Sequence, residues 1–181
     1  MKKNITKTNL YCQGLVSKDD IRCEACGVVD ELNSFLGLAK SVIRKKEIKK
    51  IIENIQRDLF LIGAEISTNI RYINRLKKRV AGSDVSFLEE KTKILKRRLK
   101  VGKGWDFTIP GEDFSSSILD VCRAITRRLE RRSITLQRKK MFKNKHILRY
   151  LNTLSNFLYF LARSLEKTPH FKKSKNSDKR L

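Results

Sequence analysis

The sequence predicts an all-α protein that folds as an antiparallel bundle of five helices. Apolar residues recur three or four positions apart in five separate segments, which is the spacing of a helix that buries one face. This is the pattern of antiparallel bundle helices that each bury one apolar stripe. No segment shows the strict alternation of a half-buried strand. Phe107 and Ile109, before the turn at Pro110 and Gly111, form at most a short extended piece.

Four apolar stripes define the first, second, third and fifth helices. The first helix is expected to start near Asp30 and Glu31, whose charges would complement the positive helix end. Gly82, Ser83 and Asp84 separate the second helix from the third, and Ser83 or Asp84 would be the N-cap. In chain order the stripes are Val28, Leu32, Phe35, Leu36, Ala39 and Ile43; Ile48, Ile52, Ile55, Leu59, Ile62 and Ile66; Leu88, Thr92, Leu95 and Leu99; and Ile147, Leu151, Leu154, Leu158, Leu161 and Leu165.

The fourth helix, expected from about residue 113 to about residue 137, carries a dense cluster of arginines. Within the run 123–132, Arg123, Arg127, Glu130 and Arg131 fall near one face, because residues three, four and seven apart stack on a helix. Like charges at this spacing repel each other. A bound polyanion would explain why so many arginines occur together.

The composition allows one folded domain and favours an anionic partner. The chain has 181 residues, of which 40% are apolar, and this is enough for a core. We expect a helical domain over residues 1–166 and a basic, disordered tail over residues 167–181. Lysine and arginine number 42 against 19 aspartate and glutamate residues, a formal net charge of +23. Nucleotides, nucleic acids and acidic membranes fit this charge, although a coding bias towards lysine would also produce it.

The sequence shows neither a membrane-spanning run nor a signal peptide, so we expect a cytoplasmic protein. Thiols stay reduced in that compartment, and no disulfide is expected among the four cysteines. Cys23 and Cys26 have C-x-x-C spacing, but no second pair or suitably spaced histidine completes a zinc site, and no metal site is predicted. His146 is expected before the fifth helix, as a surface or capping residue. No nucleophile–base set and no P-loop motif is present.

Two polar residues allow more than one interpretation. Asp30 could simply belong to a helix start, or its carboxylate could hold an arginine of the fourth helix in a bidentate pair. Asn152 lies beside the apolar stripe of the fifth helix, where an asparagine either sets the packing register or contacts a ligand.

Several motifs, taken in order, resemble the PduO-type ATP:cob(I)alamin adenosyltransferases. They extend over nearly the whole chain, and four separated motifs in one order make coincidence improbable. They are Val16–Arg22 with Glu24, Ala25 and Gly27–Ala39; Ile55–Glu65; Phe107–Gly111 followed by Arg123–Arg132; and Leu148–Ser155 with Phe160–Arg163.

The resemblance implies a five-helix bundle that assembles as a homotrimer with active sites between subunits. Such enzymes transfer the 5′-deoxyadenosyl group of ATP to reduced cobalamin and release triphosphate. ATP, magnesium and cob(I)alamin are then the expected substrates and cofactor, and the product could be passed to an adenosylcobalamin-dependent enzyme. Because reduced cobalt is itself the nucleophile, the protein would need no catalytic serine, cysteine or histidine.

The resemblance also assigns residues to the site. Arg123 would be the key arginine, held by a salt bridge to Asp30 and acting with Arg127. Phe107 would face cobalamin and keep the lower ligand off cobalt. The residues expected to contact ATP are Thr6, Lys7, Thr8, Lys18, Arg127, Arg128, Glu130, Arg131 and Asn152.

The chain departs from the family pattern at several positions. The family continues from its Thr-Lys/Arg-Thr segment into a Gly-Asp-x-Gly-x-Thr loop around the triphosphate, whereas Thr8 here is followed by Asn9-Leu10-Tyr11. Glycine lets backbone N–H groups approach phosphate closely, so losing this loop should weaken ATP binding or change its geometry. Cys26 stands where tyrosine is frequent, Glu112 replaces a glycine and Asp120 replaces a common histidine.

Two other functions fit the sequence. The chain could be a degenerate relative that binds corrinoid or nucleotide without turnover, as the missing loop suggests. It could instead be a basic nucleic-acid-binding bundle, as its net charge of +23 suggests, although no known binding motif is present.

Overall fold

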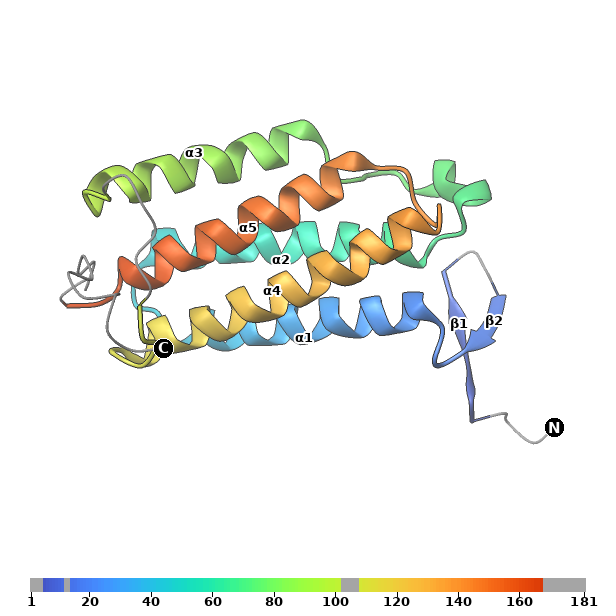
Figure 1. Ribbon diagram of the computed structural model, residues 1–181, viewed down its shortest axis with the longest axis horizontal. Helices are drawn as coiled ribbons and strands as arrows, with labels where there is room; N and C mark the ends of the chain where they lie inside the picture. The colour runs from blue at the N-terminus through green and yellow to red at the C-terminus, as the bar shows by residue number, and fades with distance from the viewer. Residues whose placement is uncertain (1–4, 12–13, 102–107, 168–181) are drawn as a thin grey trace, which may run out of the picture.

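The computed structural model describes residues 5–11, 14–101 and 108–167, and it shows the predicted bundle of five long helices with a small hairpin at one end (Figure 1). The predicted all-α class is therefore confirmed. In chain order the elements are β1 (Lys7–Leu10), β2 (Gly14–Ser17), α1 (Ile21–Val42), α2 (Lys46–Ser67), the 3₁₀ helix η1 (Ile70–Arg75), α3 (Gly82–Arg98), α4 (Phe114–Arg138) and α5 (Lys145–Arg163).

The helices lie nearly parallel or antiparallel to one another along the long axis of the molecule. α1 packs against both α2 and α4, and α5 packs against α4 and α3. In Figure 1, α3 runs along the top and α1 along the bottom, with the other long helices between them. None of the helices in the described part of the chain combines the length and apolar character needed to cross a bilayer.

The core consists of the apolar stripes that the sequence predicts. Leu32 of α1, Leu59 of α2 and Leu158 of α5 are each 0% exposed. Complete burial of one such side chain stabilises the fold by about 1.5–3 kcal/mol. The spacing of three and four residues therefore predicts the buried faces correctly.

The prediction that α1 starts near Asp30 and Glu31 is wrong. The helix begins at Ile21, and the Asp20 carboxylate caps it by accepting a hydrogen bond from the Arg22 backbone N–H at 2.9 Å. Ala25, which is 0% exposed, extends the buried stripe towards this earlier start. A single alanine between polar residues gave too weak an apolar signal to show the extra turns.

The starts of α3 and α5 also differ from expectation. Ala81 is the N-cap of α3, and Asp84 acts from inside the helix, where its carboxylate accepts the Ala81 N–H at 2.8 Å. His146 lies in the first turn of α5, because Asn144 is the N-cap and accepts the His146 N–H at 3.0 Å. These errors are displacements of one to three residues that leave the helices themselves unchanged.

The turn and start predicted for α4 agree with the structure. Gly111 has a φ of +124°, which a residue with a Cβ rarely adopts, and it reverses the chain ahead of the helix. The Asp113 carboxylate accepts the N–H groups of Ser115 at 2.8 Å and Ser116 at 3.2 Å. Ile109 has no strand partner in the described chain, and Phe107 lies outside the described residues.

The sequence predicted neither the hairpin nor the short 3₁₀ helix η1. The strands of the hairpin are antiparallel, with Lys7 opposite Ser17 and Leu10 opposite Gly14. Both strands are largely exposed, so no buried face imposes an alternating apolar pattern. Only Lys167 of the predicted tail is described, and the tail stays a prediction.

Candidate active site

A hollow of about 540 Å³ lies where the segment after β2 meets α1 and the second half of α4. It is the candidate site because cations from two distant parts of the sequence line it together. Its lining residues are Lys18, Cys23, Glu24, Gly27, Val28, Glu31, Arg128 and Arg132.

Two ion pairs join α1 to α4 across the hollow. Arg128 pairs with Glu31, and Arg132 Nη2 lies 3.3 Å from Glu24 Oε1. All four side chains are between 40% and 49% exposed, and surface pairs of this kind contribute only about 0–1 kcal/mol. The glutamates therefore orient both guanidinium groups but hold them weakly, so a polyanion can compete for them.

The hairpin brings the predicted N-terminal phosphate-binding residues next to Lys18. The Lys18 backbone N–H donates to the Thr6 carbonyl oxygen at 2.9 Å, which extends the ladder beyond Lys7. Lys18 lines the hollow, whereas Thr6, Lys7 and Thr8 lie beside it and outside its lining. Residues from the two segments assigned to phosphate binding are thus held together at one end of the bundle.

The arginines of α4 point in different directions around the helix. Arg128 and Arg132 face α1, as their ion pairs show. Arg127 and Arg131 are exposed and form no ion pair with the described side chains, so they are available to an external anion. Arg127 and Arg131, two members of the predicted face, are thus both exposed, while Arg128 and Arg132 lie on the neighbouring surface towards α1.

Arg123 points towards α5, away from the α1 side. Its Nε lies 3.7 Å from Asp120 Oδ1, and Asp120 in turn pairs with Arg163 of α5. The Asp30 side chain is exposed on α1 and has no ion pair within the described chain. The predicted Asp30–Arg123 pair is thus not formed among the described residues of the chain.

The other predicted residues are only partly placed by the structure. Asn152 is exposed on α5, which argues against a role in core register, and its contact with a ligand stays a prediction. Glu130 is half-buried on α4. Phe107, the residue expected at the cobalamin face, lies outside the described residues.

The two cysteines near the hollow are protonated thiols at neutral pH. Burial raises the pKa of Cys26 to about 11, and its Sγ lies 3.8 Å from the Gly63 carbonyl oxygen. Burial also raises the pKa of Cys23. Metals and redox partners react with thiolates, so this environment does not favour either use of the C-x-x-C pair.

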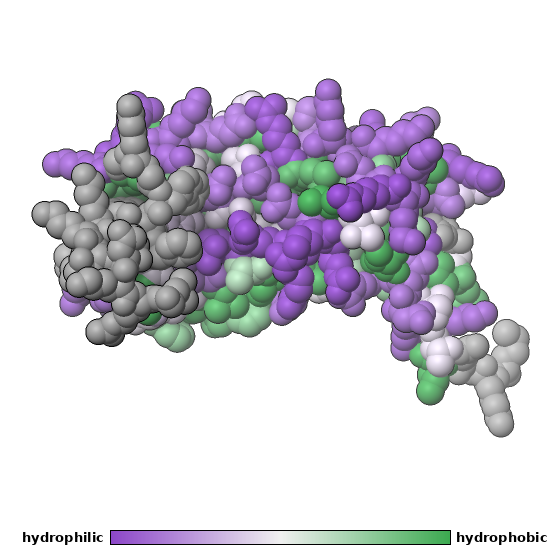
Figure 2. All heavy atoms as spheres, viewed as in Figure 1, coloured by the Kyte–Doolittle hydropathy of each residue, from purple (hydrophilic) through white to green (hydrophobic). Residues whose placement is uncertain are grey.

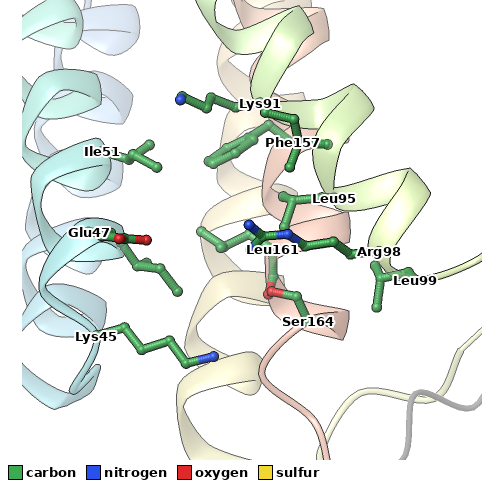
Figure 3. A pocket seen from close by; sticks show the side chains of 12 residues that line it. Lys45, Glu47, Ile51, Lys91, Leu95, Arg98, Leu99, Phe157, Leu161 and Ser164 are labelled. Carbon is green, nitrogen blue, oxygen red and sulfur yellow. The ribbon is translucent and has the colours of Figure 1, made fainter.

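A second hollow, of about 350 Å³, opens between α2, α3 and α5 at the other end of the bundle (Figure 3). Its floor includes Ile51, Phe157 and Leu161, while Lys45 and Arg98 reach across its mouth. None of the residues predicted for the site lines it.

Sequence reasoning missed several residues around the site. Glu24 and Glu31 are seven residues apart and Arg128 and Arg132 four apart, so each pair shares a helical face. This spacing could have suggested matched faces on two helices. It could not have shown which helices are neighbours, so the sequence alone does not indicate Glu31 as the partner of Arg128.

Comparison with known proteins gives a consistent result. Residues 2–165 match the family model described as Cobalamin adenosyltransferase. A corrinoid adenosyltransferase from Citrobacter freundii is 38% identical over 163 residues, 90% of this chain and 90% of that protein. A corrinoid adenosyltransferase from Bacillus subtilis is 33% identical over 154 residues, 83% of this chain and 77% of that protein. A solved variant of the PduO-type ATP:corrinoid adenosyltransferase from Lactobacillus reuteri, complexed with cobalamin and ATP, is 31% identical with a TM-score of 0.78 and covers 87% of this chain and 84% of that chain.

Proposed function

The chain belongs to the cobalamin adenosyltransferase family, and we propose that it transfers the 5′-deoxyadenosyl group of ATP to the cobalt of a reduced corrinoid. The products are adenosylcobalamin and triphosphate. The observation that carries this proposal is the convergence of Lys18, Arg128 and Arg132 on one hollow, beside the exposed Arg127 and Arg131.

The reaction places two demands on the protein, and the site meets both with cations. The reduced cobalt attacks the 5′ carbon of ATP, so ATP must be oriented with that carbon towards the metal. Charge then builds up on the departing triphosphate and must be stabilised. Guanidinium groups bind phosphate oxygens bidentately, and Lys18 adds a further positive charge.

Magnesium would enter the site with ATP. Among the described residues, no three His, Cys, Asp or Glu side chains are grouped to hold a metal ion. Magnesium usually keeps several waters and binds nucleotide phosphates with few protein ligands. The phosphates would therefore be its main ligands, and the arginines would neutralise the remaining charge.

The functional assembly is a homotrimer with active sites between subunits. Leu38, Phe114 and Val121 expose 45%, 66% and 43% of their surfaces on α1 and α4. Figure 2 shows apolar surface along part of the lower edge of the molecule, where α1 runs in Figure 1, in contrast to the mainly hydrophilic surface over α3. Burial of this surface between subunits would also allow Asp30 of one subunit to pair with Arg123 of the next.

The first experiment measures adenosylcobalamin formation spectroscopically from ATP, magnesium and chemically reduced cobalamin. We expect Arg127→Ala to weaken ATP binding and slow the reaction, because it removes an unpaired cation beside the hollow. Arg97→Ala is the matched control, since Arg97 is equally an exposed arginine but belongs to α3. ATP binding unchanged by Arg127→Ala would show that the assigned site is wrong.

The trimer is tested with a charge placed in the apolar surface. Val121→Asp should convert the trimer to smaller species in size-exclusion chromatography with light scattering, whereas Ser86→Asp, on the exposed side of α3, should not. A native protein that is already monomeric at micromolar concentration would contradict the proposed assembly.

The assay also separates catalysis from binding alone. Tight ATP binding by a folded trimer that forms no product would identify a non-catalytic relative, as the missing glycine loop suggests. Restoration of a Gly-Asp-x-Gly-x-Thr segment after Thr8 should then create activity. Transfer of the product to an adenosylcobalamin-dependent enzyme stays a prediction.

A further inference from the structure

Asp120 connects the arginine assigned to catalysis with a buried arginine on another helix. Its Oδ1 lies 3.7 Å from Arg123 Nε, and its Oδ2 lies 2.5 Å from Arg163 Nη2. We propose that Asp120 is a positioning residue for Arg123 and that Arg163 fixes Asp120 for this task. The proposal rests on the proposed function and on the catalytic role that the family resemblance gives to Arg123.

Arg163 is a rigid anchor for this arrangement. Its side chain is 1% exposed and lies 2.8 Å from Glu166 as well as 2.5 Å from Asp120. Its Nη1 donates to the Thr108 hydroxyl at 2.6 Å. Because Nη2 contacts both carboxylates and Nη1 donates to Thr108, the guanidinium group cannot rotate without breaking charge-assisted hydrogen bonds, and the Asp120 carboxylate is held in one orientation.

Arg123 is held on one edge only. Its Nε is buried without a hydrogen-bond partner, and Asp120 Oδ1 lies 3.7 Å away, just beyond hydrogen-bond distance. The side chain is nevertheless 35% exposed, and its terminal amino groups form no ion pair within the described chain. Because a guanidinium group is planar, fixing Nε also fixes the direction in which Nη1 and Nη2 point.

In this geometry two carboxylates would contact opposite edges of the Arg123 guanidinium group. Asp120, from the same helix, would orient the inner edge of the guanidinium group. The outer edge stays open to a phosphate oxygen or to Asp30 of a neighbouring subunit. A small movement of Arg123 towards Asp120 would shorten the 3.7 Å contact to a hydrogen bond and satisfy the buried Nε.

The contrasting interpretation is that Asp120 only compensates the charge of Arg163. Glu166 provides a matched control, because its carboxylate also pairs with Arg163 but forms no ion pair with Arg123. Asp120→Asn and Glu166→Gln each remove one negative charge from the same buried cluster. A purely structural role predicts similar consequences for both variants.

The kinetic test is a double-mutant cycle between Asp120 and Arg123. Asp120→Asn should lower kcat about 10- to 100-fold, the scale expected when a catalytic group is misplaced, with a smaller change in the KM for ATP. In an Arg123→Ala background the same change should have no further effect on kcat. Glu166→Gln should leave kcat close to that of the native enzyme. Equal effects of Asp120→Asn in both backgrounds, or equal loss of kcat with Glu166→Gln, would overturn the proposal.

A second readout does not depend on turnover. In ¹H–¹⁵N NMR spectra of the arginine side chains, the Arg123 Nε–H signal should exchange slowly with water in the native protein and faster in Asp120→Asn. Asp120→Glu keeps the charge if Asp120→Asn fails to fold, and it should restore slow exchange only in part. An Arg123 signal that is unchanged in a folded Asp120 variant would refute the contact. An inactive native protein with the expected NMR behaviour would refute the proposed function instead.

Discussion

Replacing Arg163 with methionine should destabilise the protein far more than replacing Arg149, although both arginines lie on α5. Arg163 Nη2 is 2.8 Å from Glu166, and Arg149 Nη2 is 2.8 Å from Glu89. The two contacts therefore have the same length. They differ in exposure: 1% and 3% for the Arg163 pair against 61% and 34% for the Arg149 pair.

The expected magnitudes follow from this difference. Removing one partner of a buried ion pair costs about 3–5 kcal/mol, because the remaining charge stays in a poorly solvated environment. In Arg163→Met an apolar side chain fills most of the space of the arginine stem, but the carboxylates of Asp120 and Glu166 lose their shared cation. Arg149→Met leaves Glu89 accessible to water and should cost about 0–1 kcal/mol.

The destabilisation by Arg163→Met should also depend on pH. Burial raises the pKa of Glu166 in the native fold, and Arg163 opposes that rise. Without Arg163 the folded-state pKa rises further above the unfolded value. A carboxyl group whose pKa is higher in the folded state than in the unfolded state favours folding at pH values below its unfolded pKa. This contribution is lost as pH rises through the folded-state pKa. The loss of unfolding free energy caused by Arg163→Met should therefore be smaller at about pH 5 than at about pH 8.

Urea denaturation followed by circular dichroism measures these free energies. All variants must be compared at one protein concentration, because subunit association adds to apparent stability. A deficit below about 1 kcal/mol for Arg163→Met, or one equal to that of Arg149→Met, would show that burial does not control the strength of the network.

Three further predictions concern other parts of the fold. Burial raises the pKa of Glu65, so Glu65→Gln should become more stable relative to the native protein as pH increases from about 4.5. Thermal unfolding at several pH values measures this, and a stability difference that does not change with pH would contradict it. Burial raises the pKa of Cys26 to about 11 and that of Cys122 to about 12. Both thiols should therefore resist alkylation at neutral pH and react after unfolding, as mass spectrometry would show. Rapid labelling of the native protein would contradict their burial. Asp113→Ala should cost about 1 kcal/mol in urea unfolding, because it removes the α4 N-cap, and no loss would contradict that role.

The sequence predicts the long helices well because their physics is local. Leu32, Leu59 and Leu158 occur in stripes that any helix must bury, and the turn before Asp113 has its own residue signals. The hairpin was missed because it buries no apolar face. The early start of α1 was missed because the one buried residue of its first turns, Ala25, is small.

The candidate site is harder to predict, because it depends on which helices are neighbours. Lys18 and Arg128, which the motifs assign to ATP contact, both line the hollow, and their contact with ATP stays a prediction. The motifs do not reveal that Glu31 is the intrachain partner of Arg128, or that Asp120 points to Arg163 and not into the polyanion site. These contacts depend on the rotation of α4 between α1 and α5, which side-chain spacing within one helix does not determine.

The rotation of α4 also gives its arginines different partners, which suits the proposed reaction. Arg128 and Arg132 sit in weak, half-exposed pairs that ATP can displace, while Arg127 and Arg131 have no competing carboxylate in the described chain. Arg123 alone is next to a carboxylate that a buried network holds in place. Residues that capture a flexible triphosphate benefit from adaptable side chains, whereas a residue at the reacting centre must be fixed beforehand. If this division is correct, Arg128→Ala should mainly raise the KM for ATP, and Arg123→Ala should mainly lower kcat.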